Sequence, residues 1–173
     1  MKKINICGKR NVDSLLSYNN DNKKTKRANV SNWKNIFPDF GHFKQIEYLN
    51  KLFLDQTYIG MDIVRKQIQN KLLNYKNQDR IKNKDITKVI SFEDCLEKLV
   101  VSKLTCVYCR KYCMILYEEV RNPSQWTLDR IDNSIGHSKD NVVVCCLSCN
   151  IKRGVMNDEK FKFTKQLKII KKC

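Results

Sequence analysis

The chain has 173 residues, of which 34 are lysine or arginine and 18 are aspartate or glutamate, so its formal net charge is +16 at pH 7. This length predicts one domain, or one domain with an added arm. The charge favours a polyanionic partner, and the lack of any run of about 18 apolar residues argues against a membrane span. Met1–Arg10 contains no apolar segment of the kind that a secretory signal needs, so we expect an intracellular location.

The first part of the chain is predicted to be a basic arm followed by helices. Residues 1–30 are polar and rich in lysine and asparagine, and they predict a flexible arm that either contacts a nucleic-acid backbone or is a solvated tail. Residues 31–103 are predicted to form a helical support region, because apolar residues recur there at steps of three and four. The apolar stripe of its second helix comprises Met61, Val64, Ile68, Leu72 and Tyr75.

A further helix is predicted to begin at Ser91, because Ser91-Phe92-Glu93-Asp94 has the pattern of a capping box. This helix leads directly to Cys106 and is expected to brace the cysteines that follow. Met114–Tyr117 is predicted to be a short strand, and Pro123 excludes a helix from the loop after it.

Two Cys-x-x-Cys pairs enclose the next segment, namely Cys106 with Cys109 and Cys146 with Cys149. Two such pairs supply the four thiolates of a tetrahedral Zn2+ site, and a site with four sulfur ligands is structural because no position is left open. The alternative is a set of free or disulfide-bonded cysteines, which the odd number of nine cysteines disfavours. Competing ligands are Cys113 and Cys145, although only Cys146 makes the pair with Cys149.

A hairpin and a helix are predicted between and after the cysteine pairs. Residues 126–131 are aromatic and β-branched, residues 133–136 have turn chemistry, and residues 142–144 are three valines, so the order is strand, loop, strand. A short helix is predicted from Leu147 to a stop near Gly154. An antiparallel return would bring Asp129 close to Asn150, and two oxygen ligands suit a hard cation such as Mg2+.

The ordered motifs resemble those of the HNH endonucleases, which belong to the His-Me finger (ββα-metal) superfamily. The resemblance is strongest to the zinc-containing branch that occurs in phages, mobile elements and large DNA viruses, and it covers residues 104–156. The motifs that carry it are Leu128-Asp129-Arg130-Ile131-Asp132, Gly136-x-x-x-Asp140-Asn141-Val142 and Cys146-x-x-Cys149-Asn150.

The resemblance implies a metal-dependent hydrolysis of DNA phosphodiester bonds. Asp129 and Asn150 match the two ligands of the single catalytic metal, Mg2+ or Mn2+, and Asn141 matches the asparagine whose amide holds the loop. In such a site the metal stabilises the charge that develops on the phosphate while a base activates water.

One position departs from the family pattern. The general base of the family is usually a histidine directly after the metal-binding acid, and this chain has Arg130 there. A guanidinium cannot accept a proton, so Arg130 is expected to hold the scissile phosphate instead. His137 in the same loop is the substitute base, or else a solvent-facing residue that contacts phosphate. His42 is expected to be structural.

Residues 157–173 are predicted to form a basic C-terminal helix with a packing stripe of Phe163, Leu167 and Ile170. The whole chain is therefore predicted to be α+β, with a ββα-metal core clamped by a four-cysteine zinc site between a mainly helical N-terminal region and a C-terminal helix.

The leading functional hypothesis is a metal-dependent DNA endonuclease. The alternative is a zinc-bearing DNA-binding module that does not cut, which the missing histidine after Asp129 supports. A third hypothesis, an intracellular redox or zinc-storage protein, accounts for the nine cysteines but not for the hairpin or the charge. The sequence leaves monomer and homodimer open, and a viral origin would place the protein in the host cytoplasm or nucleus.

Overall fold

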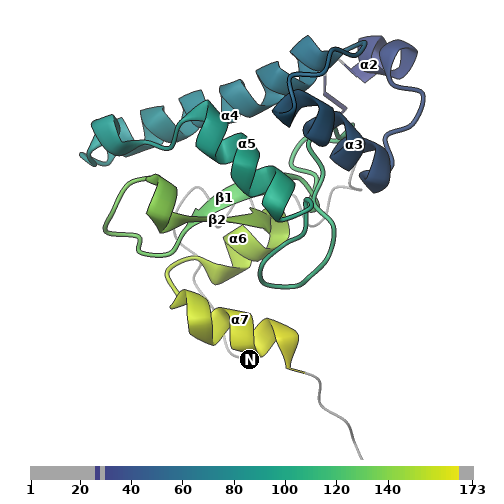
Figure 1. Ribbon diagram of the computed structural model, residues 1–173. Helices are drawn as coiled ribbons and strands as arrows, with labels where there is room; N and C mark the ends of the chain where they lie inside the picture. Colours follow the sequence, from purple (N-terminus) through teal and green to yellow (C-terminus); the bar gives the residue numbers. More distant parts are fainter. Residues whose placement is uncertain (1–25, 28–29, 168–173) are drawn as a thin grey trace, which may run out of the picture.

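The computed structural model describes residues 26–27 and 30–167 of the chain (Figure 1). Most of the predicted basic arm therefore lies outside the described residues. The described elements are α2 (Val30–Ile36), α3 (His42–Phe53), α4 (Met61–Ile81), α5 (Phe92–Val101), β1 (Trp126–Arg130), β2 (Val142–Cys146), α6 (Leu147–Arg153) and α7 (Asp158–Gln166), with 3-10 turns at Ile86–Lys88 and Lys139–Asn141. The structure thus mixes helix and strand, as the sequence predicted.

The helices that precede the hairpin pack together on one side of it, and α6 and α7 lie on the other side (Figure 1). The predicted apolar stripe of α4 is buried at Val64, Ile68 and Tyr75. α5 begins where the capping pattern predicted, because the Ser91 hydroxyl oxygen accepts a hydrogen bond of 3.0 Å from the Asp94 backbone N–H. Leu99 of α5 is fully buried, so this helix joins the core to the cysteine loop that follows.

The hairpin is a two-stranded antiparallel sheet in which Trp126 pairs with Cys146 and Arg130 pairs with Val142. β2 continues directly into α6, which ends at Gly154 with a φ of 54°. Glycine suits this position because positive φ is costly for residues with a Cβ atom. The order strand, strand, helix is the order that the sequence predicted.

Two predicted features are absent or shifted. Residues 114–117 form no strand, and only Met114 makes an isolated bridge, to Gln125. The backbone N–H groups of Ile115 and Leu116 instead donate to the buried Gln45 side chain, at 2.8 and 2.9 Å, so this segment pairs with a side chain of α3 rather than with a strand.

The packing residue of the C-terminal helix is also different from the predicted one. Phe161 is buried and meets the Tyr108 ring edge-on at 5.0 Å between centroids, whereas Phe163 and Leu167 are exposed. The third predicted packing residue, Ile170, lies outside the described residues. Across the part of the chain that the structure describes, no helix combines the length and the apolarity needed to cross a bilayer.

Candidate functional site

The four cysteines of the two pairs converge at the base of the hairpin. The sulfur atoms of Cys106, Cys109, Cys146 and Cys149 all lie within 4.8 Å of one another, and the thiols of Cys109 and Cys146 are 3.9 Å apart. Tetrahedral zinc with bonds of about 2.3 Å separates its sulfur ligands by roughly 3.8 Å, so the spacing fits the metal. The described cysteines are all free. The cluster can therefore hold a structural metal ion such as zinc.

Two short segments bring these sulfurs together. The first pair lies in the loop after α5, which is attached to β2 because the Val107 N–H donates to the Val144 carbonyl oxygen at 3.1 Å. In the second pair Cys146 ends β2, and the Cys149 N–H donates to the Cys146 sulfur at 3.4 Å. Hydrogen bonds from the thiols of Cys113 and Cys146 lower the pKa of Cys106, which favours its thiolate.

The two competing cysteines are outside the four-sulfur group. Cys145 points to the opposite face of β2 from Cys146, where its thiol contacts the Thr127 hydroxyl at 3.2 Å. Burial raises the pKa of Cys145 and keeps it a neutral thiol. Cys113 is buried beside Cys106.

Asp129 lies on β1 with both carboxylate oxygens occupied. The Tyr108 hydroxyl donates to Oδ2 at 2.7 Å, and Nη1 of Arg153 donates to Oδ1 at 2.8 Å. Burial raises the pKa of Asp129, while the bonds from Tyr108 and Arg153 act against that shift. Arg153 also donates to the Ile131 carbonyl oxygen at 2.8 Å, so it ties the end of α6 to β1.

Asn150 approaches the same side of the hairpin from α6. Its side-chain amide donates to the Thr127 hydroxyl at 3.1 Å and to the Leu128 carbonyl oxygen at 3.3 Å. The fold thus places Asn150 one turn before Arg153 and over the strand that carries Asp129. α6 packs against β1 as predicted, but the side chains that contact the Asp129 carboxylate are those of Arg153 and Tyr108.

These contacts decide whether the residues fit a catalytic magnesium or manganese ion. A hard cation needs open oxygen ligands and usually brings several waters with it. Asp129 is only 5% exposed, and the guanidinium of Arg153 already supplies the positive charge beside its carboxylate. The arrangement therefore does not fit a divalent cation at Asp129 and Asn150.

The side chains of Arg130 and His137 both lie beside Asp79 of α4. Adjacent strand residues point to opposite faces, and the Arg130 guanidinium is 4.0 Å from the Asp79 carboxylate on α4. His137 Nδ1 is 2.8 Å from the same carboxylate, and its backbone N–H donates to it at 2.7 Å. Tyr75 stacks on the imidazole at 4.5 Å between centroids.

His137 is therefore a buried residue rather than a solvent-facing one, with 4% of its surface exposed. Burial lowers its pKa, and the hydrogen bond and charge of Asp79 act against that shift. Within the described residues, no hydrogen bond or ion pair links the imidazole of His137 or the guanidinium of Arg130 to the Asp129 carboxylate. The structure does not bring the predicted base to the predicted metal ligand.

Asn141 closes the loop between the strands. Its side-chain oxygen accepts from the Asp132 N–H at 2.8 Å, and its amide donates to the carbonyl oxygens of Asp132 and Gly136, both at 2.9 Å. His42 has a structural environment, since its Nε2 is 3.2 Å from the Leu104 carbonyl oxygen and its ring stacks on Tyr112 at 3.8 Å between centroids.

Three residues of the site were not predicted from the sequence. Asp79 follows Tyr75 by four positions, so it continues the buried stripe of α4, and a charged residue in such a stripe signals a buried partner. Arg153 follows Asn150 by three positions and shares its helix face. Tyr108 stands inside the first cysteine pair and gave no comparable signal.

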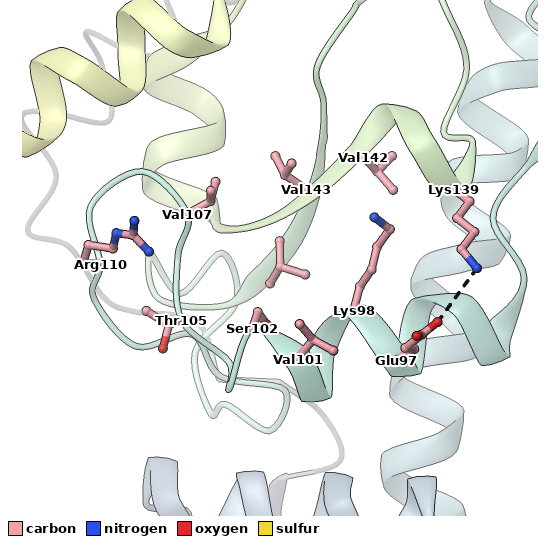
Figure 2. A pocket seen from close by; sticks show the side chains of 11 residues that line it. Glu97, Lys98, Val101, Ser102, Thr105, Val107, Arg110, Lys139, Val142 and Val143 are labelled. Atoms are coloured by element: carbon pink, nitrogen blue, oxygen red, sulfur yellow. Dashed lines mark ion pairs between the residues drawn. The ribbon is translucent and has the colours of Figure 1, made fainter.

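Two hollows border the cysteine cluster or β2. One of about 270 Å³ is bordered by Cys109, Cys146 and Cys149 and by three exposed lysines, Lys111, Lys152 and Lys165. The other, of about 500 Å³, lies between α5 and β2 and has a floor of valines, with Lys139 paired to Glu97 at its rim (Figure 2). The ion pair between Lys139 and Glu97 already pairs two of the charges of the second hollow, and we assign no chemistry to it.

Comparison of the chain with protein-family models, with curated proteins and with solved structures found no match.

Proposed function

We propose that the protein is a DNA-binding module of the HNH type, in which structural zinc clamps a ββα unit that holds DNA without cutting it. The observation that carries this proposal is the ion pair of 2.8 Å between Asp129 and Arg153. The HNH resemblance requires a metal at this carboxylate, and an arginine takes the place of that metal's charge.

The two residues considered for the general base are also unsuited to that role. Arg130 stands where the family has its general base, and a guanidinium cannot take a proton from water. His137 is buried against Asp79 and Tyr75, and burial lowers its pKa. A base for the attacking water is therefore lacking beside Asp129 in the described residues.

The positive charge of the chain supports DNA as its partner. The chain carries a net charge of +16, and lysines contribute to DNA affinity by displacing counterions from phosphates. Lys111, Lys152 and Lys165 gather beside the cysteine cluster, and none of them forms an ion pair with the described acidic residues. We place the DNA backbone over this basic surface of α6 and the cysteine loop.

The test is to incubate the zinc-loaded chain with supercoiled plasmid in Mg2+ or Mn2+ and to measure binding and nicking in parallel. We expect a retarded plasmid that stays supercoiled. A chain that contains zinc but does not retard DNA at low salt would contradict the proposal and favour the redox or zinc-storage hypothesis.

A metal-dependent endonuclease is the second candidate. It is favoured by the placement of Asp129 and Asn150 on the same side of the hairpin and by the loop contacts of Asn141. Cutting would require Arg153 to leave Asp129 when DNA binds. Nicking by the wild type that Asp129→Ala abolishes would replace the first candidate with this one. In that case His137→Ala should lower cleavage far more than His42→Ala if His137 is the base.

A further inference from the structure

A third hollow, of about 410 Å³, lies where α4 passes along β1, and we call it the α4 pocket. It shares no lining residue with the hollow beside the cysteine cluster. The described residues of its lining include two cations and no carboxylate. The charged and amide side chains around it are Arg27, Lys71, Gln67, Asn70, Asn74 and Gln125. The pocket is therefore rich in hydrogen-bond donors and has no anion of its own to balance its charge.

Lys71 is held in the pocket by neutral groups. Its ammonium donates to the Trp126 carbonyl oxygen and, at 3.3 Å, to the Gln125 side chain, and it lies 4.8 Å from the centre of the Trp126 ring. Burial, and to a smaller extent the charge of Arg27, lower the pKa of Lys71 to about 7. Neutral acceptors and a ring thus surround an amine that has no counter-charge in the part of the chain that the structure describes.

Arg27 is held in place but is not fully satisfied. Its guanidinium stacks on the rings of Tyr117 and Trp33, at 4.3 and 4.9 Å from their centres, and Nη2 donates to Gln67 at 2.8 Å. Nη1 is buried and has no hydrogen-bond partner among the described residues. A buried donor without a partner is unfavourable, and a charged one more so. A water molecule would satisfy this donor but would not balance the two charges.

We propose that the α4 pocket binds a phosphate group, held between the Arg27 guanidinium and the Lys71 ammonium with the amides of Asn70 and Asn74 around it. A guanidinium, an ammonium and several amide donors match the many acceptor oxygens of a phosphate. The phosphate is free phosphate, the terminal phosphate of a DNA strand or an internal phosphodiester. The assignment does not depend on whether the chain cuts DNA.

The test uses Trp126, which borders the α4 pocket and whose ring lies 4.8 Å from the Lys71 ammonium. The chain has two tryptophans, so 15N-labelled tryptophan gives two indole resonances, and Trp33→Phe assigns them. Inorganic phosphate is titrated into the zinc-loaded full chain at constant ionic strength, with chloride as the exchanged anion. We expect a saturable shift of the Trp126 resonance. A response equal to that of chloride would overturn the proposal.

Two variants and a matched control complete the test. Lys71→Met and Arg27→Gln should each raise the dissociation constant for phosphate by about tenfold or more, since each removes a charged hydrogen bond. Lys66→Met changes an exposed lysine of the same helix and should bind as the wild type does. Arg27 lies outside the helices and strands, so Arg27→Gln still tests the proposal if Lys71→Met fails to fold. Wild-type affinity in Arg27→Gln would overturn it.

The source of the phosphate is identified by competition. A 5′-phosphorylated oligonucleotide that displaces phosphate better than its 5′-hydroxyl counterpart indicates a strand end, and equal displacement by both indicates internal phosphodiesters. Phosphate binding with no competition from either indicates a small phosphorylated ligand. Loss of plasmid retardation with retained phosphate shifts would reject only the DNA-binding proposal, and the reverse result would reject only the α4 pocket.

Discussion

Asp129 shows how the neighbours of a residue determine its chemistry. By its place in the motif it is a metal ligand, but Tyr108 from the cysteine loop and Arg153 from the end of α6 each donate to one of its oxygens. These three side chains join the first cysteine pair, β1 and α6. Removal of one partner from a buried ion pair of this kind destabilises the native state, because the other partner is left as an unpaired buried charge.

Removal of Arg153 should therefore be costly. We expect Arg153→Ala to lower the free energy of unfolding by about 3–5 kcal/mol, because it leaves the Asp129 carboxylate buried without its partner. Denaturant unfolding followed by circular dichroism measures this. The control is Lys152→Ala, an exposed neighbour that should change stability by at most about 0.5 kcal/mol. Equal effects of the two substitutions would show that the ion pair is not structural.

The protonation of His137 makes a separate prediction. Burial lowers its pKa in the folded chain, so the unfolded chain binds more protons at pH values around the ordinary histidine pKa. The contribution of His137 to stability is therefore lost as the pH falls below about 6.5. We expect the stability of the wild type to decline over this range and that of His137→Gln to decline less, as measured by unfolding at a series of pH values. Parallel pH profiles would contradict this.

At the scale of the elements, the cysteine cluster joins the loop after α5 to the junction of β2 and α6. Four thiolates at these positions close the hairpin from one end while Asn141 closes it from the other. Metal binding of this kind contributes directly to folding, because the unfolded chain has no preformed site.

The ligand assignment is tested with single cysteine substitutions. We expect Cys109→Ser to lose its zinc and to unfold at a lower temperature, because a ligand is removed. Cys113→Ser should keep one zinc ion per chain, since Cys113 lies outside the four-sulfur group. Native mass spectrometry and thermal unfolding provide the readouts. Zinc loss in Cys113→Ser with retention in Cys109→Ser would mean that the assigned set is wrong.

Local patterns predicted these elements well where they agree with the long-range packing. The strands, α6 and the start of α5 follow from β-branched runs, a glycine stop and a capping serine. Residues 114–117 have an equally apolar pattern, but the side chain of Gln45 binds their backbone from a distant helix. No local signal reveals such a partner.

The sequence also predicted part of the candidate site. The motifs placed the four cysteines and put Asp129 and Asn150 on neighbouring elements, because the order along the chain determines the hairpin and its helix. They did not reveal that Arg153 and Tyr108 occupy Asp129 or that Asp79 binds His137. These contacts depend on which side chains the helices bring over the hairpin, and a motif specifies only its own residues.

At the scale of the whole molecule, the excess of positive charge predicts the response to salt. The affinity for duplex DNA should fall steeply as sodium chloride rises, because bound counterions are released from phosphates. Lys152→Ala and Lys165→Ala should each reduce the slope of log affinity against log salt by about one. Fluorescence anisotropy with a labelled duplex measures the slope.

The control for this series is Lys51→Ala. Lys51 lies on α3 and is already paired with Glu47 at 2.8 Å, so its removal should leave the slope unchanged. A slope that is flat for the wild type, or that changes only in Lys51→Ala, would remove the basic surface of α6 from the proposed interface.

The contacts of α4 with β1 limit how far the chain can be shortened. The Leu128 N–H donates to the Tyr75 hydroxyl at 2.9 Å, and the Trp126 carbonyl oxygen accepts from Lys71, so side chains of the helix satisfy the outward backbone groups of the strand. A fragment trimmed to residues 104–156 would keep every cysteine ligand yet leave those groups bare. An edge strand with unpaired backbone groups pairs readily with strands of other molecules. Such a fragment should therefore self-associate into oligomers that the complete chain does not form.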